Sequence, residues 1–171
     1  MFAASSSRRG RVRNLILFLL TLGWLIFIFS NSLRDGVESG QQSKRLLRAL
    51  QGLFQSFGYH GELSEHVIRK LAHFGEFAIL SFLSCLDLWS HSLFTLSDPP
   101  RRICLFAAIS LPFCFLSAGI DELLQHVSAG RGPRFSDVLI DTSGALCAYL
   151  FFLAFFFLLR VIRRKRKIRK Q

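Results

Sequence analysis

Ionisable side chains recur at helical spacing inside stretches that are otherwise apolar. A histidine and a glutamate stand three residues apart, two carboxylates are adjacent, and one aspartate follows another after a single helical turn. Carboxylates and imidazoles so placed can exchange protons with a substrate or bind a divalent cation. We therefore expect the catalytic residues to be His73, Glu76, Asp121, Glu122 and Asp141.

A second set of polar residues flanks these and is suited to binding a substrate. The segment Gly130–Pro133 predicts a tight turn that presents backbone N–H groups and a basic side chain toward an anion. Lysine and arginine are the side chains that hold phosphate. Ser136 or Asp137 would also cap the helix that follows. We expect the substrate-binding residues to be Lys70, Gln125, Arg131, Ser136, Asp137, Ser30 and Ser32.

Four long apolar runs must position these residues. The chain of 171 residues is 51% hydrophobic and 19% charged, whereas a soluble domain carries about 25% charged residues. A membrane-spanning helix needs roughly 20 apolar residues, and each run approaches that length. We predict an all-α fold in a single domain, residues 1–171, that forms an integral membrane four-helix bundle. Its spans are expected at about 14–31, 68–96, 103–122 and 137–159, with basic tails at 1–13 and 160–171.

The positions of the basic residues predict the orientation of these spans. Four precede the first run, two lie in the 97–102 link, and eight follow the last run. Basic residues that adjoin membrane spans mark the cytoplasmic side. We therefore predict a multi-pass protein of the cell (inner or cytoplasmic) membrane with both termini cytoplasmic. Its partners would be membrane lipids and not nucleic acid, despite the net charge of +11. A cleaved signal peptide in the first run is a weaker alternative, because Trp24, Phe27 and Phe29 crowd its cleavage site.

The first outer segment carries a further amphipathic pattern. Apolar residues recur at helical spacing over Leu46–Phe57. We predict an interfacial amphipathic helix there; a helix that caps the bundle is the alternative. The four cysteines lie within the apolar runs without a CxxC pair, which predicts packing residues.

The predicted topology brings the polar helix ends together. The end of the first and third spans and the start of the second and fourth all face outward. Each charge at mid-membrane costs about 2.5–3.5 kcal/mol, so these groups should meet one another and not face lipid. We predict one outward-facing polar pocket. Asp87 and His91 stand apart, toward the inner end of the second span.

The sequence resembles the VanZ-like family of small membrane proteins. The matching segments are Phe29–Ser32, Ile68–Phe77, Asp121–Gln125, Gly130–Arg131 and Ser136–Gly144. They touch all four predicted spans and about a third of the chain. The chain departs from the pattern in having Phe77, Ala129 and Asp141 where Tyr, Pro and Asn are common. The family takes its name from a protein linked to resistance to the glycopeptide antibiotic teicoplanin, so the resemblance implies a role in the cell envelope.

Two kinds of function remain open at this point. The pocket could belong to an enzyme that acts on a lipid-linked or phosphorylated envelope precursor. Alternatively, it could bind an envelope lipid or a glycopeptide without catalysis, or serve as a scaffold for a cell-wall synthesis protein. Ion transport is a weaker hypothesis, because the charges cluster at one face. The sequence contains no standard metal motif, nucleophile elbow or Walker loop, so no cofactor is certain, although a divalent cation is compatible with the carboxylates and His73.

Overall fold

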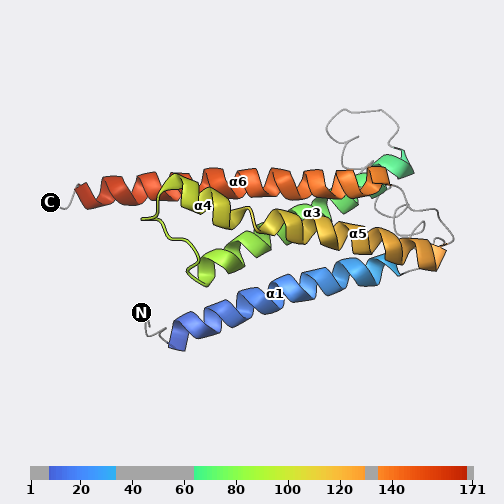
Figure 1. The fold of residues 1–171 in the computed structure, drawn as a ribbon, viewed down its shortest axis with the longest axis horizontal. Helices are drawn as coiled ribbons and strands as arrows, with labels where there is room; N and C mark the ends of the chain where they lie inside the picture. The colour runs from blue at the N-terminus through green and yellow to red at the C-terminus, as the bar shows by residue number, and fades with distance from the viewer. Residues whose placement is uncertain (1–7, 34–63, 130–134, 169–171) are drawn as a thin grey trace, which may run out of the picture.

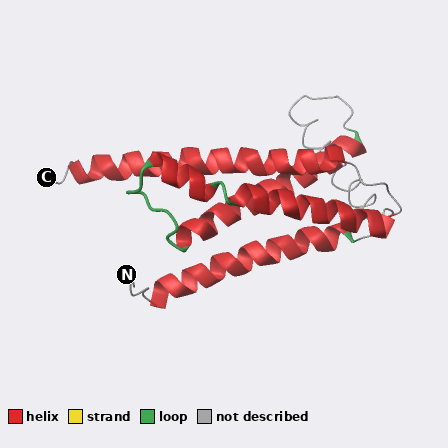
Figure 2. Ribbon diagram, viewed as in Figure 1, coloured by secondary structure: helices red, strands yellow, loops and turns green. Residues whose placement is uncertain are grey.

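The computed structural model describes residues 8–33, 64–129 and 135–168 (Figure 1). Figure 2 shows helices and connecting loops, without strands, in this part of the chain. The amphipathic helix predicted over Leu46–Phe57 and the turn that contains Arg131 lie outside the described residues. The helices are α1 (Arg8–Ser32), α3 (Glu65–Ser90), α4 (Pro100–Ala107), α5 (Ser110–Ala129) and α6 (Phe135–Ile168).

The prediction of a helical membrane protein is confirmed. Within the described ranges, four helical segments are long and apolar enough to cross a membrane: Arg8–Ser32, His66–Ser90, Pro100–Val127 and Phe135–Arg166. The start of α1 and the end of α6 lie at one end of the bundle, and the loop between α3 and α4 lies at that end as well (Figure 1). We call this the terminal end, and we call the opposite end the polar end.

The third span is divided into two helices. α4 ends at Ala107 and α5 begins at Ser110, although the sequence predicted one span over 103–122. Pro112 accounts for the break, because proline has no N–H to donate and its ring clashes with the carbonyl of the residue four positions earlier. That residue is Ala108, whose carbonyl instead accepts a hydrogen bond of 3.0 Å from the N–H of Leu111. The second half then continues to Ala129 and carries its acidic pair to the polar end.

The ends of the other helices also differ from the prediction. α3 ends at Ser90 and not near residue 96, because Ser92 adopts a φ of 61° and turns the chain out of the helix. α6 begins at Phe135, so Ser136 and Asp137 lie in its first turn and neither is the N-cap. The basic tails continue the helices: α1 starts at Arg8 and α6 runs to Ile168.

Two apolar clusters hold the bundle together around α3, which packs against α1, α5 and α6. The cluster toward the polar end is built from residues of α1, α3, α5 and α6: Ile28, Phe77, Leu80, Cys114, Ala118, Val138 and Ala145. The cluster toward the terminal end is aromatic. Phe94, in the loop after α3, is fully buried there, and its ring centroid lies 5.3 Å from that of Phe156. This packing fixes the α3–α4 loop against α6.

Candidate functional site

His73 of α3 lies between two carboxylates at the polar end. Its Nδ1 atom is 3.7 Å from Oε2 of Glu76 and 3.9 Å from Oδ2 of Asp121. Glu76 stands three residues further along the same helix and therefore shares its face. Asp121 comes from α5 and is the first charged residue in the sequence of that helix. An imidazole between two carboxylates can transfer protons in either direction.

Asp141 of α6 joins this group from a third helix. His73, Asp121 and Asp141 each offer one ligand atom, and these atoms lie within 4.8 Å of one another. Asp121 is 0% exposed and Asp141 is 3% exposed. The Oδ1 atoms of both aspartates have no hydrogen-bond partner among the residues that the structure describes. Two carboxylates and an imidazole form a donor set that divalent cations accept, so these three residues could hold one.

The end of α1 closes the group on a fourth side. Asn31 donates a hydrogen bond of 3.3 Å from Nδ2 to Oε1 of Glu76. Trp24 donates one of 2.9 Å from its indole N–H to the carbonyl oxygen of Glu76. These bonds join α1 to α3 and orient the glutamate toward His73.

Gln125 makes a similar link between α5 and α1. Its Nε2 atom donates to Oδ2 of Asp121 over 2.9 Å and to Oγ of Ser32 over 3.4 Å. Gln125 stands one turn after Asp121 on α5, so the spacing seen in the sequence places both on one face. The side chain thereby holds the aspartate in a defined orientation, with its other oxygen left for a ligand.

A cavity of about 300 Å³ opens onto this cluster. Basic side chains and histidines of α3 and α5 line one part of it, and carboxylates of α5 and α6 line another. Lys70 and Asp137 face each other across it, with Nζ and Oδ1 3.3 Å apart. The lining residues are His66, Arg69, Lys70, His73, Glu122, Gln125, His126, Asp137, Ile140 and Asp141.

The charges of this site stabilise one another. A charged group within a membrane bundle is costly unless it is paired, and the two adjacent carboxylates at the end of α5 oppose the helix dipole. Arg69 and Lys70 bring positive charge to the same cavity from the first turns of α3. A ligand that carries negative charge can therefore approach the basic side of the cavity, while the acidic side remains available for proton transfer.

The structure brings the five residues expected to be catalytic into or beside this cavity. Glu122 is 9% exposed and lines it next to the buried Asp121. Of the residues expected to bind substrate, Lys70, Gln125 and Asp137 line the cavity and Ser32 contacts Gln125.

Two of the expected binding residues lie differently. Ser30 is exposed and donates its hydroxyl hydrogen bond to the carbonyl of Ile26 in its own helix, over 2.7 Å. Ser136 is exposed and donates to Oδ1 of Asp137 over 3.2 Å. Ser136 thus reaches the site only through its neighbour, and Ser30 turns away from it.

Sequence reasoning had not assigned four residues of the site. Asn31 contacts Glu76 in place of the neighbouring Ser30, because the rotation of α1 turns residues 31 and 32 toward the bundle. Arg69 stands four residues before His73, and this spacing predicts its place on the same face of α3, although it was not among the expected site residues. His66 and His126 line the cavity from the outer turns of α3 and α5.

Comparison with known protein families gives a match over most of the chain. A protein-family model described as VanZ/LLP1 matches residues 15–160. No curated protein and no solved structure matches the chain. The matched range contains the four membrane-spanning segments except their outermost turns, and it contains the whole polar site.

Proposed function

The chain belongs to the VanZ/LLP1 family, and from this membership and the geometry of the site we propose that it binds the phosphorylated headgroup of a cell-envelope lipid or lipid-linked precursor. The polar cavity would receive the headgroup, and the apolar tail would remain in the surrounding bilayer. The positions of the basic residues support an orientation with both termini in the cytoplasm, so the headgroup would belong to the outer leaflet of the cell membrane.

The observation that carries this proposal is the division of charge inside the cavity. Arg69 and Lys70 lie on α3, whereas Glu122 and Asp141 come from α5 and α6. Basic side chains form charge-assisted hydrogen bonds with phosphate oxygens. Carboxylates are poor partners for phosphate unless a proton or a cation lies between them. A phosphorylated headgroup therefore fits with its phosphate on α3 and its reacting bond toward the carboxylates.

The acidic side of the cavity supports a catalytic role. Glu122 would act as the general base, because its carboxylate lines the cavity beside the proposed phosphate site. His73 would carry a proton to or from the leaving group, oriented by Glu76 and Asp121. General acid–base groups typically contribute about 10²–10⁴-fold to a rate.

The test is turnover by the purified full-length protein in detergent. Polyprenyl phosphate and a lipid-linked cell-wall precursor serve as substrates, and products are separated by chromatography. Glu122→Gln should lower turnover by at least about 100-fold with an unchanged melting temperature. Asp87→Asn is the matched control, because Asp87 is also a carboxylate within a membrane-spanning helix but pairs with His91, at 3.4 Å, toward the terminal end.

A non-catalytic role is the alternative that this experiment separates. If neither the wild-type protein nor Glu122→Gln converts a substrate, and both bind it equally, the catalytic proposal is wrong and binding alone remains. The protein would then bind an envelope lipid without catalysis. The other non-catalytic roles are binding of a glycopeptide such as teicoplanin, or service as a scaffold for cell-wall synthesis components. Absence of binding by the wild-type protein would contradict the proposal in both forms.

A further inference from the structure

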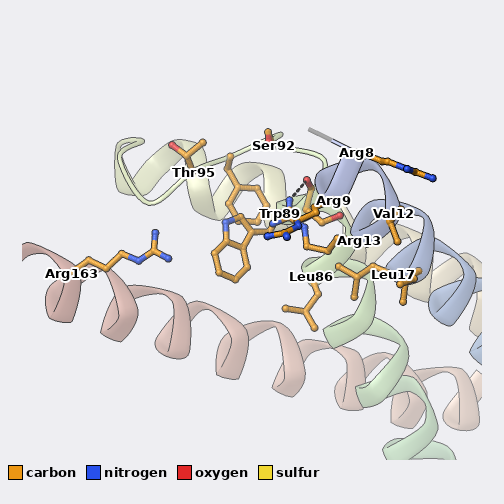
Figure 3. A pocket seen from close by; sticks show the side chains of 13 residues that line it. Arg8, Arg9, Val12, Arg13, Leu17, Leu86, Trp89, Ser92, Thr95 and Arg163 are labelled. Atoms are coloured by element: carbon orange, nitrogen blue, oxygen red, sulfur yellow. Dashed lines mark hydrogen bonds between the residues drawn. The ribbon is translucent and has the colours of Figure 1, made fainter. Parts of the chain in front are cut away.

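A second and larger cavity lies at the terminal end, away from the polar site. It has a volume of about 1120 Å³. Figure 3 shows α1, the end of α3 and the loop that follows it around this space, with Arg163 of α6 extending toward it. None of its lining residues belongs to the polar cavity.

The lining has a basic part and an apolar part. Arg8, Arg9 and Arg13 come from the first turns of α1, and Arg163 comes from the last turns of α6. None of the described lining residues is acidic. Further along α1 the wall becomes apolar, and Leu86 of α3 faces it from the other side (Figure 3). The apolar lining residues of α1 are Val12, Ile16 and Leu17.

Part of the basic rim is anchored by a specific contact. Arg13 donates a hydrogen bond of 3.1 Å to the carbonyl oxygen of Ser90, the last residue of α3. Carbonyl groups at a helix C-terminus lack partners in the helix and attract cations. This bond joins α1 to the end of α3, and it leaves Arg8 and Arg9 of α1 and Arg163 of α6 as the lining arginines that can meet a ligand.

An aromatic residue marks the boundary between the two parts. Trp89 lines the cavity beside the arginine side chains (Figure 3). Its ring packs against Phe156 in an edge-on arrangement with centroids 5.1 Å apart. Tryptophan is enriched at the level of lipid headgroups, so we expect the arginines at headgroup depth and the apolar wall at the depth of the acyl chains.

We propose that this cavity binds one anionic phospholipid of the leaflet at the terminal end. Its phosphate would lie between the arginines of α1 and Arg163, and an acyl chain would lie along the apolar residues of α1 and Leu86. Basic pockets between membrane helices on the cytoplasmic side bind anionic headgroups in this manner. Inorganic phosphate would leave the apolar wall and most of the volume unfilled. The proposal is independent of the function proposed for the polar cavity.

The test measures lipid binding to the full-length protein by native mass spectrometry from detergent. Phosphatidylglycerol should remain bound, and phosphatidylcholine with the same acyl chains should not. The double variant Arg9→Gln/Arg163→Gln should weaken phosphatidylglycerol binding by about fivefold for each arginine removed. The matched control is Arg11→Gln/Arg164→Gln, which removes the same charge from the same two helices at exposed positions that do not line the cavity. Equal loss in both double variants, or equal binding of the two lipids, would overturn the proposal.

A second measurement detects the lipid beside Trp89. The chain has two tryptophans, so Trp24→Phe leaves Trp89 as the only one. Phosphatidylglycerol with brominated acyl chains should quench its fluorescence at a lower mole fraction than brominated phosphatidylcholine does. Inorganic phosphate at millimolar concentration should not reverse the quenching. Full reversal by phosphate would assign the site to a free anion, and equal quenching by both lipids would show general solvation by lipid.

Discussion

Gly144 of α6 packs directly against the backbone of Phe74 in α3. A Cβ atom at position 144 would overlap the carbonyl oxygen of Phe74 and would lie 3.0 Å from its carbonyl carbon. Small residues let membrane helices approach closely in this way. Gly144 stands one turn after Asp141, and Phe74 follows His73, so this contact sets the distance across which the imidazole and the aspartate meet.

Gly144→Ala should therefore destabilise the protein and loosen the site. The added methyl group must move a backbone and not a flexible side chain, and overpacking of this kind costs about 1–3 kcal/mol. The measurement is the midpoint of thermal or denaturant unfolding in detergent. Gly23→Ala is the control, because a Cβ at Gly23 of α1 meets nothing within 4 Å. If both variants unfold at the wild-type midpoint, the close approach of α3 and α6 is not required.

The polar site should bind a divalent cation. When Mn²⁺ is added to wild-type protein at neutral pH, binding should reduce the electron paramagnetic resonance signal of the free ion. The binding should saturate at one Mn²⁺ per protein chain. Asp121→Asn should weaken this binding by more than about tenfold. Even substitution of a residue that only hydrogen-bonds to a metal ligand lowers metal affinity by about 10–100-fold. Asp87→Asn removes a carboxylate at the other end of α3 and should bind as the wild type does. Equal affinity in the two variants would place the ion elsewhere.

Lys70 should contribute to ligand binding more than to stability. Its pair with Asp137 spans 3.3 Å, and the two side chains are 31% and 34% exposed; such pairs contribute only about 0–1 kcal/mol. Lys70→Gln should thus keep the unfolding midpoint close to that of the wild type and lower the affinity for polyprenyl phosphate.

Arg102→Gln is the matched control for this variant. Arg102 forms a comparable pair with Asp98, at 3.4 Å, near the terminal end. It should leave the affinity for polyprenyl phosphate unchanged. A large loss of stability in Lys70→Gln, without an effect on affinity, would show that the lysine has a structural role and would remove it from the proposed phosphate site.

The orientation in the membrane can be tested with two exposed serines at opposite ends of the bundle. Ser64 directly precedes α3, and Ser97 lies in the loop before α4. Ser64→Cys should react with a membrane-impermeant thiol reagent in intact cells, whereas Ser97→Cys should react only after lysis. The unmodified chain, with its four native cysteines, gives the background. The reverse pattern would put the polar cavity on the cytoplasmic side.

Helical spacing was sufficient to predict which residues share a face. His73 with Glu76 and Asp121 with Gln125 meet in the structure because three- and four-residue separations place side chains on one side of a helix. The convergence of separate spans could also be predicted, because charged groups in a bilayer must face one another or face water. Both arguments depend only on residue type and local periodicity.

The rotation and packing of whole helices could not be predicted in the same way. Local spacing does not reveal that α1 turns Asn31 toward Glu76 and leaves Ser30 exposed. Nor does it reveal that an arginine at the start of α1 and Arg163 near the end of α6 border one cavity.

The sequence alone therefore determined the class of protein, its four candidate membrane spans and which polar residues share a helix face, because hydrophobicity and helical period are local properties. Only the tertiary structure decided the phase of each helix, the break before Pro112, the approach of Gly144 to Phe74 and the second cavity. These features depend on how side chains from different helices fit together, and that fit is a property of the folded bundle and not of any one segment.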